Sequence, residues 1–324
     1  MNLVAANPEP QISAPSHAAE VASETDAASF HRILGIDFFD GSAKAAVALM
    51  RNGGLLVIPA APALKDLDRN RDYRDALHNA DLALSDSAFM VLIWNRLQSR
   101  PIKRISGLGY LRELLLEPDL RQPGNTLWIM ANPVSAQRNL AWLQQKGITL
   151  PEDNMYIAPV YSRTNGNQTG YPTACPEPAE GSESSDVGST NGATSGNGKQ
   201  SADILSGSSD THSTSLSDPA LLALIDRLRP QHIVVTIGGG TQERLGLYLK
   251  RNLAYRPAIH CIGAAIAFLS GDQVHIPVWA DKYYLGWLLR SVSEPKRYLP
   301  RYLDAFKLYP LMRRYRDRLP DLKP

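Results

Sequence analysis

Short, largely apolar runs alternate with helix-length segments along this chain, and that alternation limits the fold more than any other feature. Residues 55–58, 126–130 and 233–237 are such runs. A continuous apolar run is typical of a strand buried on both faces, and helices between such strands cover both faces of a parallel sheet. The pattern therefore predicts an α/β fold with a mostly parallel, Rossmann-like sheet and flanking helices.

The same pattern places each expected element. Strands are expected at residues 33–39, 55–58, 82–84, 126–130, 155–160, 233–237 and 259–262. Helices are expected at residues 43–51, 71–79, 89–97, 136–146, 220–228 and 242–252. Gly53-Gly54 and Gly147 follow two of these helices, at positions where glycine commonly ends a helix.

Two segments depart from this pattern in composition. Residues 1–29 are rich in Ala, Pro, Ser and Glu, and residues 162–217 are dominated by Ser, Gly, Asn, Thr and Asp. Neither has enough large apolar side chains to form a core, so a disordered arm and a disordered insertion are predicted. The α/β core is then expected at residues 30–161 and 218–285, followed by a basic amphipathic helical appendage at residues 286–324.

Cysteine content and hydropathy bear on location. Cys175 and Cys261 are the two cysteines of the 324 residues and stand far apart, so neither a disulfide framework nor a zinc site is expected. No run approaches the about 20 apolar residues of a membrane span. Residues 1–24 lack the basic start and the apolar run of a signal peptide. The protein is therefore expected to stay in the cytoplasm.

Gly238-Gly239-Gly240 is the first candidate for a ligand site, because it joins an expected strand to the helix that Gln242 and Glu243 open. Glycines let the backbone approach a phosphate, and N–H groups at a helix start attract anions. Parallel sheets bind ligands at the C-terminal ends of their strands. The segment is neither a P-loop nor a GxGxxG fingerprint. On the local pattern alone, a tight turn without a ligand accounts for it equally well.

Asp86 is the second candidate, because it follows the strand expected at residues 82–84 and precedes a helix. A carboxylate in that place can act as general base on an acceptor hydroxyl. The alternative is a helix cap, in which Asp86, Ser85 or Ser87 accepts from N–H groups of the helix start. From the residues alone, the cap is the favoured interpretation.

The C-terminal region is basic and aromatic. Tyr298, Tyr302 and Phe306 recur every four residues and share one helical face, beside Arg297 and Arg301. Such a helix can lie on an anionic membrane, and its arginines can bind a pyrophosphate. A packed helix with a solvated basic side is a serious alternative. No nucleic-acid recognition motif is present, so no nucleic-acid partner is expected.

The sequence has few motifs that would indicate a metal site or a catalytic nucleophile. The histidines have no metal-ligand spacing, and no Asp-x-Asp pair follows an expected strand. His232 and His260, near strand starts, are interpreted as structural. No Gly-x-Ser-x-Gly elbow appears. Neither a metal nor a cofactor is expected.

In their order along the chain, these segments resemble the WecG/TagA/CpsF glycosyltransferase family. The family's Gly-x-Pro-Lys-Gln-Glu loop is similar to residues 238–243, its Gly-Gly-Ala-Phe segment to 262–271, and its Arg-Ala-Pro-x-Trp segment to 275–279. Its Leu-Glu-Trp-Leu-x-Arg helix and the Glu-Pro-x-Arg and Arg-Tyr motifs are similar to residues 285–290, 294–297 and 301–302. Residues 80–86 and 104–107 match more loosely. The similarity spans about residues 31–161 and 218–310.

The resemblance implies an inverting, metal-independent hexosyltransferase. It would move an N-acetylhexosamine, such as N-acetylmannosamine, from a UDP-sugar to a polyprenyl-pyrophosphate-linked acceptor in surface or exopolysaccharide synthesis. The implied base is Asp86. Substrate contacts are implied at Gly107, Gly238, Gly239, Gly240, Gln242, Glu243 and Gly263, and pyrophosphate contacts at Arg290, Arg297 and Arg301. The basic tail would dock on the inner face of the cell membrane, and a homo-oligomer is compatible with this arrangement.

Departures from the family's pattern keep a second function open. Ser87 stands in place of the glycine after the acidic residue, Gly240-Thr241 in place of Pro-Lys, and Gly109 and Gly286 in place of acidic residues. These changes favour, as the alternative, a non-catalytic nucleotide-sugar-binding or scaffold protein of a polysaccharide cluster. An epimerase is disfavoured, because GxGxxG and Tyr-x-x-x-Lys motifs are missing.

Overall fold

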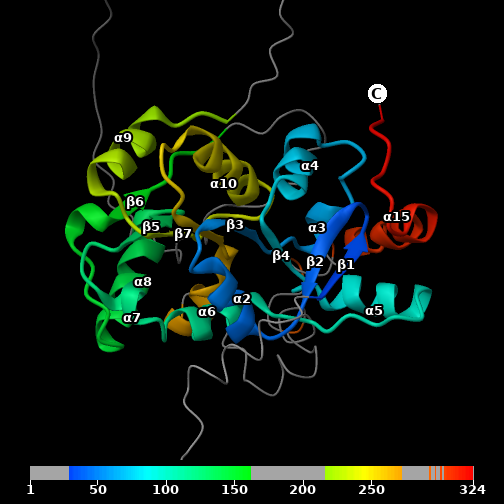
Figure 1. Ribbon diagram of the computed structural model, residues 1–324, viewed down its shortest axis with the longest axis horizontal. Coiled ribbons are helices and arrows are strands. Elements are labelled where there is room, and N and C mark those ends of the chain that lie inside the picture. The colour runs from blue at the N-terminus through cyan, green and yellow to red at the C-terminus, as the bar shows by residue number, and fades with distance from the viewer. Residues whose placement is uncertain are drawn as a thin grey trace, which may run out of the picture.

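The computed structural model describes residues 29–161, 216–271 and 303–323, together with Val292, Lys296 and Pro300. Strands in this part of the chain are β1 Ser29–Ile33, β2 Ile36–Asp40, β3 Gly54–Val57, β4 Leu82–Leu84, β5 Thr126–Met130, β6 Met155–Ile157, β7 His232–Val235 and β8 Ala258–Cys261. They form one sheet in the order β1-β2-β4-β3-β8-β7-β5-β6 (Figure 1). Each neighbouring pair is parallel except β1 and β2. The prediction of a mostly parallel, Rossmann-like α/β sheet is confirmed.

Helices cover both faces of the sheet (Figure 1). The first core lies under α3 Ala61–Leu64, α4 Arg71–His78, α5 Ala88–Leu97, α9 Pro219–Leu228, α10 Thr241–Asn252 and α15 Leu308–Tyr315. The second core lies under α2 Ala43–Met50, α6 Gly107–Leu114, α7 Pro118–Arg121, α8 Pro133–Gln145 and α11 Ala267–Ser270. The short 3-10 turns are η1 Glu152–Asn154 and η2 Gly263–Ala265.

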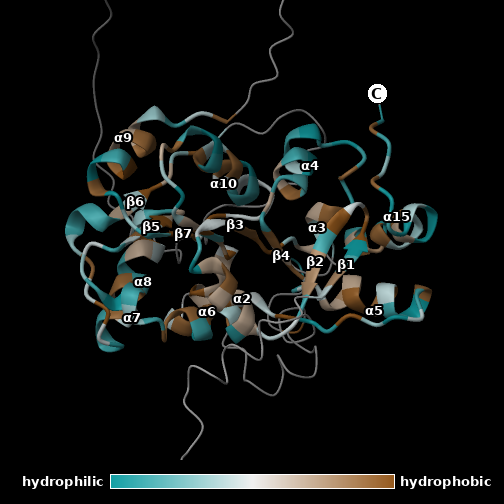
Figure 2. Cartoon of the chain, viewed as in Figure 1, coloured by the Kyte–Doolittle hydropathy of each residue, from teal (hydrophilic) through white to brown (hydrophobic). Residues whose placement is uncertain are grey.

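Strand side chains alternate between the two cores. Leu55 and Val57 of β3 belong to the first core, and Leu56 between them belongs to the second. Because both faces are buried, the strand is apolar at every position. Figure 2 shows the same effect as hydrophobic colour on the strands and on one side of helices such as α9.

Residues 33–39 comprise the last residue of β1, the turn and most of β2 of a hairpin, so the prediction of a single strand there is wrong. Leu34 and Gly35 have φ of 51° and 76°, the positive values that a tight hairpin turn between antiparallel strands requires. Their N–H groups donate to the carbonyls of Arg316 and Asp317, at 2.7 and 2.9 Å. Leu34 is 1% exposed. Because Leu34 is apolar and buried, the sequence pattern at this position is typical of a strand and does not indicate a turn.

The apolar pattern does not predict α6. Gly107 and Gly109 open this helix, and glycine is a poor helix former. The Ser106 hydroxyl caps the helix start by accepting from the Gly109 N–H at 2.9 Å. Leu111 of α6 is buried in the second core together with Ala258, the first residue of β8, and Ile262, the residue after that strand. Burial of one face therefore outweighs the weak local propensity.

The end of the chain packs into the first core. Ala305, Leu308 and Met312 are at most 3% exposed. Further along, the Lys323 N–H donates to the Asp68 carbonyl at 2.7 Å. The last part of the region expected as an appendage therefore belongs to the core of the fold.

The chain leaves and re-enters the described structure at one point. The Tyr161 hydroxyl donates to Asp218 Oδ2 at 2.6 Å, and the Tyr156 hydroxyl donates to the same oxygen at 2.9 Å. Asp218 also caps α9 by accepting from the Leu221 N–H at 3.0 Å. Residues 161 and 218, on either side of the predicted insertion, are thus joined directly.

None of the helices formed by described residues is long and apolar enough to span a membrane.

Candidate functional site

The helix connections diverge between β5 and β7, which are neighbours in the sheet. From β5 the chain runs through α8 outward to β6, whereas from β7 it runs through α10 inward to β8. The two helices cover opposite faces of the sheet. In parallel sheets a crevice opens at such a point, at the C-terminal ends of the strands. That edge of the sheet is the first place to look for a site.

Asp86 lies at this edge, after β4, with its carboxylate at the start of α6. Its Oδ1 accepts from the Gly107 N–H at 3.1 Å and from Arg104 Nη2 at 3.0 Å. Arg104 Nε also donates to the Asp86 carbonyl at 2.5 Å. The Asp86 side chain is 35% exposed, whereas that of Arg104 is 15% exposed. The carboxylate is therefore oriented by fixed donors and still reachable by a substrate hydroxyl.

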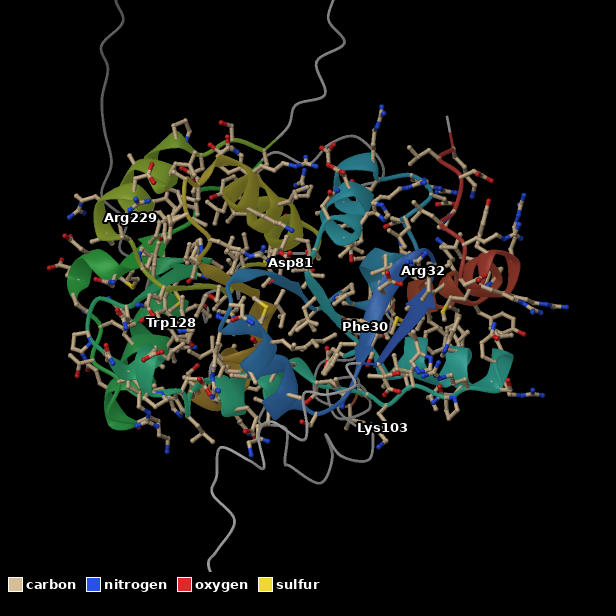
Figure 3. All side chains as sticks on the ribbon, in the orientation of Figure 1. Phe30, Arg32, Asp81, Lys103, Trp128 and Arg229 are labelled. Atoms are coloured by element: carbon tan, nitrogen blue, oxygen red, sulfur yellow. The ribbon has the colours of Figure 1, made fainter. Side chains whose placement is uncertain are left out.

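Of the three candidates for the helix cap, Ser87 caps α5, whereas Asp86 accepts from the N–H of Gly107, the first residue of α6. The Ser87 hydroxyl caps α5 by accepting from the Met90 N–H at 3.2 Å. Ser85 is buried, and its hydroxyl donates to the Lys103 carbonyl at 2.7 Å. Figure 3 shows Lys103 at the lower margin of the view. Ser85 and Ser87, the two neighbours of Asp86, therefore make structural hydrogen bonds, and the Asp86 carboxylate is not needed to cap α5.

Gln242 and Glu243 connect two turns at the ends of β7 and β8. Glu243 Oε2 accepts from the Gly240 N–H at 2.6 Å, and its Oε1 accepts from Gln242 Nε2 at 3.1 Å. Gln242 Oε1 accepts from the Gly263 N–H at 2.6 Å. Gln242 is 2% exposed and Glu243 is fully buried. The buried Glu243 and Gln242 side chains therefore hold the backbone of the turns at Gly240 and Gly263 by hydrogen bonds.

Burial has a chemical consequence for Glu243. Removal of the carboxylate from water raises the pKa of Glu243 to about 7, although the Gly240 N–H, the Gln242 amide and the charge of Arg244 lower it. The group that holds the glycine turn therefore changes charge near neutral pH.

The triglycine turn itself is open. A Cβ added at Gly239 or at Gly240 would meet no heavy atom within 4 Å. Gly240 has a φ of 87°, which favours glycine. Thr241 and Gln242 donate their N–H groups to the Gly238 carbonyl at 3.3 and 3.1 Å. The exposed Gly239 is therefore the point at which a ligand can approach the backbone most closely.

One continuous set of contacts joins these residues across three strand ends. Gly107 donates to Asp86, and a Cβ added at Gly107 would lie 3.8 Å from the Ile262 carbonyl oxygen. Gly263, the next residue, donates to Gln242. These contacts, with the bonds of Glu243 and of the Gly238 carbonyl, link in one row Asp86, Gly107, Gly263, Gln242, Glu243 and the turn Gly238, Gly239 and Gly240. Arg290, Arg297 and Arg301 lie outside the described residues.

Arg104 contacts Asp86 in the structure but is not among the site residues predicted from the sequence. The signal for it is its place at the head of the segment 104–107, which matches the family's Arg-Val-x-Gly pattern. In the structure its guanidinium holds both the carboxylate and the carbonyl of Asp86.

Within the described ranges, no group of three or more His, Cys, Asp or Glu side chains could hold a metal ion.

Comparison with known proteins gives one family. The model of the glycosyl transferase WecG/TagA/CpsF family matches residues 31–163 and 197–321, which is most of the chain. The matched ranges include each residue that meets at the sheet edge. No curated protein matches the sequence.

Proposed function

Because the chain belongs to the WecG/TagA/CpsF family of glycosyltransferases, we propose that it transfers an N-acetylhexosamine from a UDP-sugar to a polyprenyl-pyrophosphate-linked acceptor in surface or exopolysaccharide synthesis. The observation that supports this proposal is the row of contacts along one edge of the sheet, in which Asp86 binds the Gly107 N–H, Gly107 lies near Ile262, and Gly263 binds Gln242 at the second glycine turn. A base and an open glycine turn at a helix start, where a phosphate can approach the backbone, are two parts that such a transfer needs.

The reaction is a single displacement. An acceptor hydroxyl attacks the anomeric carbon of the donor as Asp86 takes its proton, and the bond from that carbon to UDP breaks with inversion. The pyrophosphate of UDP leaves with the bonding electrons. Its charge would be stabilised by the positive end of α10 and by Arg290, Arg297 and Arg301, without a metal.

The donor site is tested at Gly239. Gly239→Ala adds a methyl group that meets no protein atom, so the fold should be retained. If a diphosphate lies against this turn, the methyl group should raise the KM for the UDP-sugar by roughly tenfold, which is about 1.4 kcal/mol of lost binding. Gly240→Ala is the contrast, because its φ of 87° makes an alanine strained and should lower Tm.

The decisive experiment follows transfer to synthetic polyprenyl-pyrophosphate-N-acetylglucosamine by mass spectrometry over a panel of UDP-sugars. Wild type should add one sugar from one donor. Asp86→Asn should lower kcat by about 10²-fold or more, because the amide cannot take a proton. Asp37→Asn is the control, since Asp37 is exposed and pairs with Arg32 on the surface.

The same experiment separates the two functions. UDP binding without product from any donor or acceptor would favour the nucleotide-sugar-binding or scaffold protein. Equal rates for wild type and Asp86→Asn would remove Asp86 as the base.

We also propose that the protein docks on an anionic membrane, at the inner face of the cell membrane where its acceptor would lie. Exposed apolar side chains gather near α5 and α15: Leu92, Leu303, Phe306 and Tyr309 are 58%, 60%, 59% and 42% exposed. Phe306 contacts Phe89, three residues after Asp86, with ring centroids 5.0 Å apart. Exposed Lys307, Arg313 and Arg314 add positive charge beside this surface.

Docking is tested by sedimentation with vesicles that contain anionic lipid. Leu92→Asp combined with Phe306→Asp should reduce the bound fraction several-fold, because two charges would enter the interface. Val160→Asp is the matched control on an exposed apolar residue elsewhere. An unchanged bound fraction in the double variant contradicts the proposal.

A further inference from the structure

A chain of three polar side chains crosses the second core beneath α6. Tyr110 of α6 and His260 of β8 are fully buried, and His232 at the start of β7 is 6% exposed. The Tyr110 hydroxyl lies 2.8 Å from His260 Nδ1, and His260 Nε2 lies 3.1 Å from His232 Nδ1. The side chains around them, such as Leu56 and Leu111, are apolar. The three polar groups therefore satisfy one another.

The direction of each hydrogen bond follows from the chemistry. Burial lowers the pKa of His232 and of His260, so both rings are neutral and each has one donor and one acceptor nitrogen. The buried Tyr110 hydroxyl hydrogen needs an acceptor, and His260 Nδ1 is within reach. His260 Nε2 then carries the ring hydrogen and donates to His232 Nδ1. The bonds run one way, from α6 to β8 to β7.

Tyr110 shares a helix face with the first residue of α6. Gly107 and Tyr110 are three positions apart, which places them side by side on a helix. A Cβ added at Gly107 would lie 3.4 Å from Ile58 Cδ1, so this face of the helix packs next to the residue that follows β3. The Gly107 N–H donates to Asp86 Oδ1. Any shift of the helix along or about its axis would therefore move the donor that orients Asp86.

We propose that Tyr110, His260 and His232 are positioning residues that lock α6 onto the sheet, so that the first N–H of the helix orients the Asp86 carboxylate. This inference rests on the proposed role of Asp86 as base. Apolar packing alone would bury the same surface, but it is not directional, whereas hydrogen bonds weaken steeply when distance or angle changes. All three side chains act on Asp86 through α6.

The test is Tyr110→Phe, which removes one oxygen and keeps the ring. Leu111→Val is the matched control, because Leu111 is the next residue of the same helix, is fully buried and has no polar group. Each variant should lower Tm by about 2–4 °C. Only Tyr110→Phe should also lower kcat, by about tenfold, while the KM for the donor stays within about twofold.

A second readout does not depend on activity. Hydrogen exchange of the Gly107 amide should be several-fold faster in Tyr110→Phe than in Leu111→Val, because its bond to Asp86 opens more often. If wild type transfers no sugar, the proposed function fails, and the exchange of Gly107 still decides whether the network positions α6. Equal Gly107 exchange in the two variants, or a wild-type kcat in Tyr110→Phe, overturns the inference.

Should Tyr110→Phe fail to fold, His232→Leu tests the same network from the rim of the core. It leaves Tyr110 and His260 in contact and removes the last acceptor. We expect a smaller loss of kcat, about threefold, with faster exchange at Gly107. No change in either quantity would overturn the inference as well.

Discussion

At the scale of single residues, Glu243 shows how the fold sets the properties of a side chain. Its carboxylate is fully buried, yet it accepts from the Gly240 N–H and from the Gln242 amide. Burial raises the pKa of Glu243 from 4.5 to about 7. Ionisation therefore strengthens the bonds that shape the glycine turn and at the same time weakens the fold as a whole.

The stability contributed by Glu243 should fall as pH rises. The folded pKa lies above the unfolded value of 4.5, so the contribution is complete below about pH 4.5 and is lost as pH rises through about 7. Urea unfolding should show a loss on the order of 2–3 kcal/mol between pH 5 and pH 8. Glu243→Gln should abolish that loss, whereas the exposed control Glu152→Gln should keep it. Parallel pH profiles for wild type and Glu243→Gln would contradict the assignment.

Asp86 illustrates a limit of reasoning from single residues. A carboxylate before a helix is compatible with a cap and with a base, and the residue types favour the cap. The structure assigns the cap to Ser87 and surrounds Asp86 with Arg104 and Gly107, which follow 18 and 21 positions later. Contacts between residues so far apart in the sequence depend on where α6 packs. The residue types next to Asp86 do not specify that packing.

At the scale of elements, serine caps start the helices near the site. Ser87→Ala should destabilise the protein by about 1 kcal/mol and lower Tm by about 2–4 °C, because the Met90 N–H loses its acceptor. Ser42→Ala, which uncaps α2 at the Ala45 N–H, should cost a similar amount. Transfer rates of the two variants should stay within about twofold of wild type. A loss of kcat confined to Ser87→Ala would show that Ser87 takes part in the chemistry.

The β1–β2 turn gives a second test at this scale. Gly35→Ala should destabilise the protein by about 2 kcal/mol or more, because the residue has a φ of 76° and its Cβ would lie 2.6 Å from Leu319 Cβ. Gly124→Ala is the control for backbone strain alone, since Gly124 has a φ of 88° and open space around it. Denaturant midpoints compare the two. Equal losses would show that the C-terminal segment does not press on the turn.

At the scale of the whole molecule, the two ends of the segment predicted to be an insertion are tied together. The Tyr161 hydroxyl and Asp218 lie 2.6 Å apart across the segment that separates them in sequence. Closing a shorter loop loses less chain entropy, and each halving of loop length favours the fold by about 0.6 kcal/mol.

Replacement of residues 163–215 by a Gly-Ser linker of about six residues should leave Tm unchanged or higher. Asp218→Asn in the shortened protein should remove that gain, because it weakens the junction at Tyr161 and the cap of α9. Calorimetry measures the Tm of the shortened protein and of its Asp218→Asn variant. A folded, shortened protein that has lost sugar transfer would show that the insertion has a catalytic or docking task.

The sequence by itself determined the features that depend on near neighbours. Apolar runs placed β3, β4, β5, β7 and β8, because a strand buried on both faces must be apolar at successive positions. Glycines after β7 and after β8 marked the turns, and the order of strands and helices predicted a parallel sheet with its site at the C-terminal edge. These features follow from local geometry and burial, which the order of residue types records.

Only the tertiary structure decided what depends on distant partners. Gln242 binds Gly263, Tyr110 binds His260 and Asp86 binds Gly107, in each case across elements that the chain reaches much later or earlier. The antiparallel strand β1, the helix α6 and the packing of residues 305–312 into the first core likewise depend on surfaces made elsewhere. A hydrogen bond between remote residues forms only once packing has set their separation and angle, and a linear pattern of residue types contains neither.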